Sequence, residues 1–198
     1  MTITAITTQT KLAGRYSVFV DGSFAFGIEA GQLLELGLVK GQEITAKQLA
    51  ELKSETQLGY MFDKTLNLLS IRPRSEWELR DYLKRKKQPP AAIEIILNKL
   101  TKLHYVDDVA FAKRWVENRQ LLKPSSTLKL KAELKQKRIA DSVIHEVLKS
   151  NDNHEAEALN ELIERKAKRY PDQRKLMQYL ARQGFRYEDI KRAIQEKS

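Results

Sequence analysis

Six basic side chains recur at matching positions of two segments and could form a binding site. They are, in chain order, Arg80, Lys84, Lys87, Lys131, Lys135 and Arg138. The first three fall on one flank of a helix predicted to start at Ser75, away from its apolar stripe, and the last three take the same positions relative to Ser126. We call these six residues the cationic stripe. Basic surfaces attract polyanions and acidic proteins, so the pattern predicts a partner of one of these kinds.

Two interpretations of the cationic stripe are open at this point. Cations are common in the last turn of a helix, where the macrodipole favours positive charge, and most such residues are simply solvated. Their recurrence at matching positions favours a binding surface instead. Trp77 falls beside Lys84 and opposite the apolar residues. Its indole could contact a partner or a base, or pack against the preceding helix.

Residues that could catalyse a reaction form no recognisable pattern. The eight glycines build no phosphate-binding loop, and the three histidines have no metal-ligand spacing. Asp107 and Asp108 could suggest a metal-dependent nuclease, but their place directly before an apolar helix favours an N-cap. We therefore expect no catalytic residue, no metal ion and no cofactor.

The composition indicates a globular protein with a basic surface. Apolar residues make up 41% and charged residues 31% of the 198 residues, and there is no cysteine to form a disulfide or a thiolate metal site. The net charge is +10, and residues 1–53 contribute none of it, since they hold equal numbers of basic and acidic side chains. The sequence has no signal-peptide pattern and no apolar stretch of membrane-spanning length, so a cytoplasmic location and no membrane partner are expected.

The N-terminal segment is the part with strand character. Residues 15–20 and 23–28 are rich in apolar residues and flank Asp21-Gly22, a pair typical of a two-residue hairpin turn. Further elements are expected to be a third strand at residues 2–7 and short helices at residues 29–36 and 45–52.

From residue 54 onward the pattern is helical and it repeats. Taking Ser75, Ser126 and Asp172 as equivalent helix starts aligns three copies without gaps, at offsets of 51 and 46 residues. Apolar residues recur in every copy at four positions after these starts. The twelve residues are Leu79, Leu130, Leu176, Leu83, Leu134, Leu180, Ile93, Ile144, Ile190, Leu97, Leu148 and Ile194. These matched columns indicate tandem units of about three helices each.

The predicted fold is mainly α: three tandem three-helix repeats in an elongated curved array, with a small N-terminal segment of a β-hairpin and short helices. The long first helices of the repeats are expected at residues 57–71, 107–120 and 154–169. We place the N-terminal segment at residues 1–53, and repeats 1 to 3 at residues 54–103, 104–151 and 152–198. The last repeat has a polar edge and needs no partner for solubility, so a monomer is expected.

Three motifs along the chain carry a resemblance to a known family. The first is RPRSEWELRDYL (residues 72–83), with an arginine pair, Ser-Glu and Glu-Leu-Arg at helical spacing. The second is YVDDVAFAKRWVENR (residues 105–119), with an aromatic residue and paired aspartates ahead of Phe-Ala. The third is YLARQGFRYEDIKRAI (residues 179–194). Together these motifs resemble the RecX family, the regulators of the RecA recombinase. The N-terminal VFVDGSFAFGI and LGLVKGQEI resemble the hairpin extension of many members, so the likeness covers nearly the whole chain.

The resemblance implies binding along the groove of the RecA–DNA filament. It implies an inhibitor that limits filament growth and RecA's ATPase, strand-exchange and coprotease activities, in recombinational repair and the SOS response. Residues in the matching motifs join the cationic stripe and Trp77 as candidates for contact with the filament. These further candidates are Arg72, Arg74 and Arg119.

A DNA-binding protein is the main alternative. Short helix pairs with a basic second helix are similar to helix-turn-helix motifs, but here the cations stand in the middle and at the ends of the helices. Phosphate contacts alone would give a steep inverse salt dependence and little sequence specificity. Weak binding of single- or double-stranded DNA is compatible with a role on RecA.

The chain departs from the family pattern at the ends of two predicted helices. Members commonly have Lys-Gly after the second helix of repeats 1 and 2, where this chain has Lys86-Lys87 and Lys137-Arg138. Glycine adopts a left-handed backbone conformation at little cost, and a cationic residue does not. We therefore expect the turn after Lys87 to use Gln88-Pro89-Pro90 instead.

Overall fold

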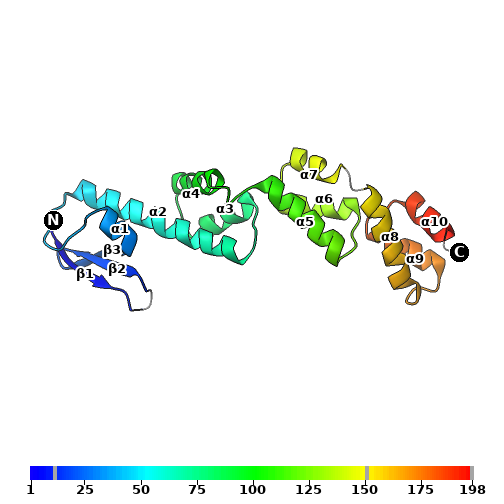
Figure 1. Cartoon of the computed structure of the whole chain (residues 1–198), viewed down its shortest axis with the longest axis horizontal. Helices are drawn as coiled ribbons and strands as arrows, with labels where there is room; N and C mark the ends of the chain where they lie inside the picture. The colour runs from blue at the N-terminus through cyan, green and yellow to red at the C-terminus, as the bar shows by residue number, and fades with distance from the viewer. Residues whose placement is uncertain (11–12, 150–151, 197–198) are drawn as a thin grey trace. The chain divides into compact units, whose positions relative to one another are not determined.

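The computed structural model describes residues 1–10, 13–149 and 152–196, which are mainly helical (Figure 1). Near the N-terminus, β1 (Ile3–Thr8), β2 (Arg15–Val20) and β3 (Ser23–Glu29) form an antiparallel sheet in the order β1-β2-β3. Asp21 and Gly22 both have positive φ, of 50° and 82°, as a tight turn between β2 and β3 requires. The predicted hairpin and third strand are confirmed.

The sheet buries its apolar side chains together with residues of the following segment. Helix α1 (Ala30–Glu35) and the first half of α2 (Ala46–Ile71) lie beside it, and Leu49 and Leu52 of α2 pack against the buried cluster (Figure 1). Arg15 adds a polar link, because its guanidinium pairs with Glu29 at 2.9 Å and lies 3.9 Å from the centre of the Tyr60 ring. The buried residues are Ile3, Val18, Val20, Phe26, Ile28, Leu38 and Ile44.

Helix α2 runs unbroken for 26 residues, where the sequence predicted two separate helices. It begins with a capping box between Thr45 and Gln48. Thr56, in the predicted gap, is buried and donates its hydroxyl to the carbonyl of Leu52 at 2.7 Å, so its polar group is satisfied inside the helix. The boundary placed after residue 53 falls within α2, which serves both the sheet and repeat 1.

Each repeat consists of a long helix followed by two shorter ones. Repeat 1 has the second half of α2, then α3 (Glu76–Arg85) and α4 (Pro90–Lys102). Repeat 2 has α5 (Asp108–Leu122), α6 (Thr127–Gln136) and α7 (Asp141–Leu148). Repeat 3 has α8 (Asp152–Ala167), α9 (Gln173–Arg182) and α10 (Tyr187–Gln195).

The predicted apolar columns form the interior of the repeats. All twelve residues are buried, none of them more than 8% exposed. The mainly α fold with three three-helix domains is therefore confirmed. Their arrangement as an elongated curved array stays a prediction, and the boundary expected after residue 151 lies outside the described residues.

Repeats 2 and 3 each have a core of their own. In repeat 2, α5 is capped by Asp107, whose carboxylate accepts the N–H groups of Val109 and Ala110 at 2.8 and 3.0 Å, so the N-cap interpretation is confirmed. The repeat 2 core comprises Phe111, Ala112, Val116, Leu130, Leu134, Ile139, Ile144 and Leu148.

Among the described residues, no helix combines the length and the apolar character needed to cross a bilayer.

Candidate functional site

In repeat 1 the cationic stripe lies on α3. Leu79 and Leu83 of this helix are fully buried, which leaves the flank that carries the cations toward solvent. Lys84 and Lys87 are exposed. Arg80 is half-buried, and its guanidinium pairs with the carboxylate of Glu76 at 2.8 Å. Of the three stripe residues in repeat 1, the two lysines are therefore the accessible cations.

In repeat 2 the stripe borders a hollow of about 510 Å³ between α6 and α7. Lys131 and Lys135 line it from α6, together with Asp141 and Lys149. The Nζ of Lys135 lies 3.2 Å from the Asp141 carboxylate, and Arg138 is exposed nearby in the chain. Three lysines beside one carboxylate make the recess electropositive, which suits phosphate or carboxylate groups.

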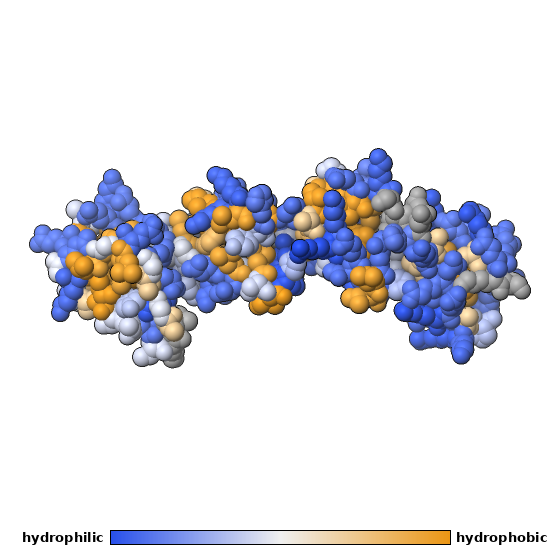
Figure 2. All heavy atoms as spheres, viewed as in Figure 1, coloured by the Kyte–Doolittle hydropathy of each residue, from blue (hydrophilic) through white to orange (hydrophobic). Residues whose placement is uncertain are grey.

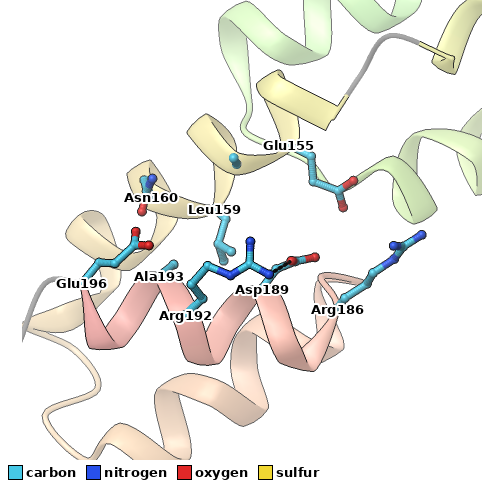
Figure 3. Close-up of a pocket in the computed structure, with 9 residues that line it drawn as sticks. Glu155, Leu159, Asn160, Arg186, Asp189, Arg192, Ala193 and Glu196 are labelled. Atoms are coloured by element: carbon cyan, nitrogen blue, oxygen red, sulfur yellow. Dashed lines mark ion pairs between the residues drawn. The ribbon is translucent and has the colours of Figure 1, made fainter.

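Repeat 3 has a pocket of about 440 Å³ between α8 and α10, and the charges that line it differ from those in repeat 2 (Figure 3). Arg186 and Arg192 line it together with three carboxylates, and Arg192 lies 3.8 Å from Asp189. This balance of charge does not favour a polyanion. It agrees with the sequence of repeat 3, where the stripe positions hold Met177, Ala181 and Gly184.

Arg119 has a structural role that the sequence did not indicate. Its Nε donates to the Glu133 carboxylate at 2.7 Å, and the same oxygen accepts the indole N–H of Trp115 at 2.9 Å. These bonds join α5 to α6 within repeat 2, and a contact of Arg119 with the filament stays a prediction. Of the other candidates, Trp77 is 40% exposed, Arg72 is exposed and Arg74 is half-buried.

The ends of α3 and α6 correct the expectation about the missing glycines. Lys87 and Arg138 adopt left-handed φ values of 56° and 57°. The N–H of Gln88 reaches the carbonyl of Leu83 at 3.1 Å, in the closure typical of a helix that ends at a left-handed residue. The turn therefore forms at Lys87 itself and not through Gln88-Pro89-Pro90. Its main-chain hydrogen bonds offset the conformational cost of a left-handed residue with a side chain.

Buried serine hydroxyls join the second helix of one repeat to the second helix of the next. Ser126 starts α6 and donates its hydroxyl to the main-chain carbonyl of Gln183, at the end of α9, at 2.8 Å. Ser75 makes the same bond to the carbonyl of Lys137, at the end of α6, at 3.0 Å. Both serines are fully buried, and each hydroxyl also accepts the N–H of the residue three positions later. We call the Ser75–Lys137 and Ser126–Gln183 bonds the serine joints.

Acidic residues of the next long helix complete the serine joints. Asp108 of α5 accepts the N–H of Glu76 at 2.8 Å, and Glu155 of α8 accepts the N–H of Thr127 at 3.2 Å. The sequence indicates the serines only as helix starts, because their partners lie more than 50 residues away. One difference in the sequence could have indicated the joints. The two repeats that are followed by another repeat have serine at this position, whereas the last repeat has Asp172, which caps α9 by accepting the N–H of Arg174.

Asp108 makes the first serine joint sensitive to pH. Burial raises the pKa of its carboxyl above the ordinary value of 3.8; the hydrogen bond from the Glu76 N–H opposes this rise, and the charges of Glu76 and Asp107 add to it. The folded state therefore binds this proton more tightly than the unfolded chain does. The contribution to the free energy of unfolding is thus present below pH 3.8 and is lost as the pH rises through the folded pKa.

Replacing Asp108 with asparagine should remove this dependence while keeping an oxygen that can accept the Glu76 N–H. Between about pH 4 and about pH 7 the wild type should lose the contribution of Asp108, and the variant has none to lose. The free energy of unfolding of Asp108→Asn minus that of the wild type should therefore rise over this range. Urea unfolding at both pH values measures the difference. A difference that stays constant with pH would contradict the assigned shift.

Models of the RecX family match four parts of the chain. The N-terminal domain of regulatory protein RecX matches residues 1–45, and the first, second and third three-helix domains of RecX match residues 62–100, 107–148 and 153–194. These ranges contain the sheet and most of each three-helix repeat.

Individual relatives and solved structures agree with the family models. A regulatory protein RecX from Bacillus velezensis is 33% identical over 202 residues, which cover 98% of this chain and 76% of the relative. One from Listeria welshimeri is 33% identical over 75% of this chain, but the match spans only 55% of the relative's length. A crystal structure of regulatory protein RecX has a TM-score of 0.74 at 28% identity and covers 96% of this chain and 98% of its own. For RecX from Lactobacillus salivarius the TM-score is 0.65 at 28% identity, over 70% and 95% of the two chains. The chain belongs to the RecX family of regulatory proteins.

Proposed function

We propose that this protein acts in the cytoplasm as an inhibitor of RecA. It binds the RecA–DNA filament and limits its assembly, and with it the ATPase, strand-exchange and coprotease activities that serve recombinational repair and the SOS response. The observation that carries the proposal is the recurrence of accessible cations at matching positions of two consecutive repeats. Lys84 and Lys87 of repeat 1 correspond to Lys135 and Arg138 of repeat 2. A recurring surface suits a partner that itself repeats, such as a polymer of identical subunits, and membership of the RecX family supports RecA as that polymer.

Binding to DNA itself is the second candidate function. The hollow of repeat 2 favours it, because Lys131, Lys135 and Lys149 line one recess and could contact phosphates. Such binding would weaken steeply as salt increases, and bare DNA would compete with the filament for the protein.

The DNA-dependent ATPase of RecA separates the two functions. The protein is added in amounts well below one molecule per RecA, with single-stranded DNA in excess so that competition for DNA cannot lower the rate. Inhibition under these conditions supports action on the filament. Inhibition that begins only when the protein saturates the DNA would instead place DNA binding first.

Reversing one accessible charge in each of repeats 1 and 2 should weaken the inhibition. We expect Lys84→Glu with Lys131→Glu to raise the concentration needed for half-inhibition by about tenfold or more, because like charges then face an acidic partner. Both lysines are exposed and lie off the buried apolar columns, so circular dichroism should show an unchanged fold. The ATPase assay above measures the effect.

A second double variant controls for net charge alone. Lys40→Glu with Lys53→Glu changes the net charge equally, at exposed positions of the N-terminal segment. It should inhibit RecA as the wild type does. Equal losses in the two double variants would mean that only the total charge matters, and the cationic stripe would then have no specific role.

A further inference from the structure

Large apolar side chains are exposed to solvent on both sides of the turn between α5 and α6. Leu121 and Leu122 end α5, Leu128 lies in the first turn of α6, and they are 83%, 79% and 63% exposed. Figure 2 shows a group of apolar atoms that projects where α5 ends. Single exposed leucines are ordinary on protein surfaces, but several around one turn make it a candidate interaction site.

Repeat 1 carries exposed apolar residues at the same positions. Relative to the N-cap serines, Leu122 corresponds to Ile71 and Leu128 corresponds to Trp77. Ile71 is 76% exposed, and Trp77 is the half-exposed indole described above. We call Ile71, Trp77, Leu122 and Leu128 the apolar anchors.

The apolar anchors occur in the same repeats as the cationic stripe. In repeat 3 the two anchor positions hold Lys168 and Arg174, both exposed, and the stripe positions there hold no cation. Both features are thus present in repeats 1 and 2, and both change in repeat 3. This joint change indicates that anchors and stripe serve one partner.

The residue types at the anchor positions indicate a protein and not a nucleic acid. Bases stack on flat aromatic or guanidinium faces, which Trp77 could supply. Leu128 takes the same position in repeat 2 and has no such face. Aliphatic side chains gain most from an apolar recess in another protein, and the adjacent Lys123, which is exposed, fits an acidic rim around that recess.

We infer that the apolar anchors insert into apolar recesses with acidic rims on subunits of the RecA filament. The inference rests on the proposed function, because it takes the filament as the partner. The cations of the stripe then speed and orient the encounter, and the anchors hold the complex once it has formed.

The test compares binding of the full chain to RecA filaments on single-stranded DNA with binding to the same DNA without RecA. The variant is Leu122→Ala with Leu128→Ala, and Ile71→Ala with Trp77→Ala repeats the test on the other pair. Leu34→Ala is the matched control, since Leu34 is 82% exposed in α1 and lies outside the anchor positions. Alanine keeps helix propensity at exposed sites, so all variants should fold, as circular dichroism can check.

Each anchor variant should lose about tenfold or more in affinity for the filament, mainly through faster dissociation. Binding to bare DNA should not change, and Leu34→Ala should bind as the wild type does. If the wild type binds the filament and the anchor variants bind equally well, the inference is wrong and the proposed function stands. If the wild type does not bind the filament, both are wrong.

Two further outcomes would assign the anchors to another occupant and overturn the inference. Equal losses on filaments and on bare DNA would place the anchors in a DNA-binding surface. A wild-type dimer that the anchor variants dissolve, seen by sedimentation velocity, would place them between two copies of this chain.

Discussion

Replacing Gly184 with alanine is expected to lower the free energy of unfolding by about 2–4 kcal/mol, the sum of a strained backbone and a lost buried hydrogen bond. Gly184 ends α9 with a φ of 92°, a conformation that residues with a side chain rarely adopt. A Cβ at this position would lie 2.7 Å from the Oγ of Ser126. The alanine would therefore displace the hydroxyl that donates to Gln183, and it would break the second serine joint.

Urea unfolding followed by circular dichroism measures this loss, and Arg138 supplies the matched control. Arg138 holds the equivalent position in repeat 2, has a φ of 57° and already carries a Cβ. We expect Arg138→Ala to change the free energy of unfolding by no more than about 0.5 kcal/mol. A loss at Gly184 of only about 1 kcal/mol, the cost of a left-handed backbone by itself, would mean that contact with Ser126 contributes little.

Replacing Leu134 with alanine should destabilise the protein by about 2–5 kcal/mol, through lost burial and the cavity left behind. Leu134 is fully buried on α6 and packs in the core of repeat 2 with residues of α5 and α7. Thermal or urea unfolding measures the change. A loss below about 1 kcal/mol would mean that the core closes around the smaller side chain.

Leu128 on the same helix gives the matched comparison for Leu134. It is exposed, so Leu128→Ala should leave the free energy of unfolding within about 0.5 kcal/mol of wild type. The same variant should weaken binding to the RecA filament if the anchor inference holds. The two leucines, six residues apart, would then separate stability from recognition.

The parts of the fold that depend on neighbours in the chain could be predicted from the sequence. Asp21-Gly22 requires positive φ at both positions, and this specifies the hairpin. Asp107 precedes an apolar helix and accepts its first free N–H groups. The twelve apolar residues recur at helical spacing, and burial follows from that spacing alone.

The parts that could not be predicted depend on how helices pack or on which of several possible partners a side chain takes. Thr56 lies between two helical patterns, yet α2 continues through it, and its hydroxyl donates to the Leu52 carbonyl one turn earlier. The serine joints and the Arg119–Glu133 pair need helices already placed against each other. Spacing placed the cationic stripe on an outer flank, but it did not indicate that Glu76 binds Arg80 or that Asp141 binds Lys135.

Because α2 is one continuous helix, it fixes the rotation of the N-terminal sheet about the helix axis relative to the repeat 1 half of the same helix. Each residue of an α-helix turns the chain by about 100° and advances it by about 1.5 Å. One residue inserted between Tyr60 and Met61 would therefore swing the sheet around the helix axis by about that angle, and seven would return it to nearly its former face, about 10 Å further along. The direction in which the sheet faces is thus set by the number of residues in a single helix.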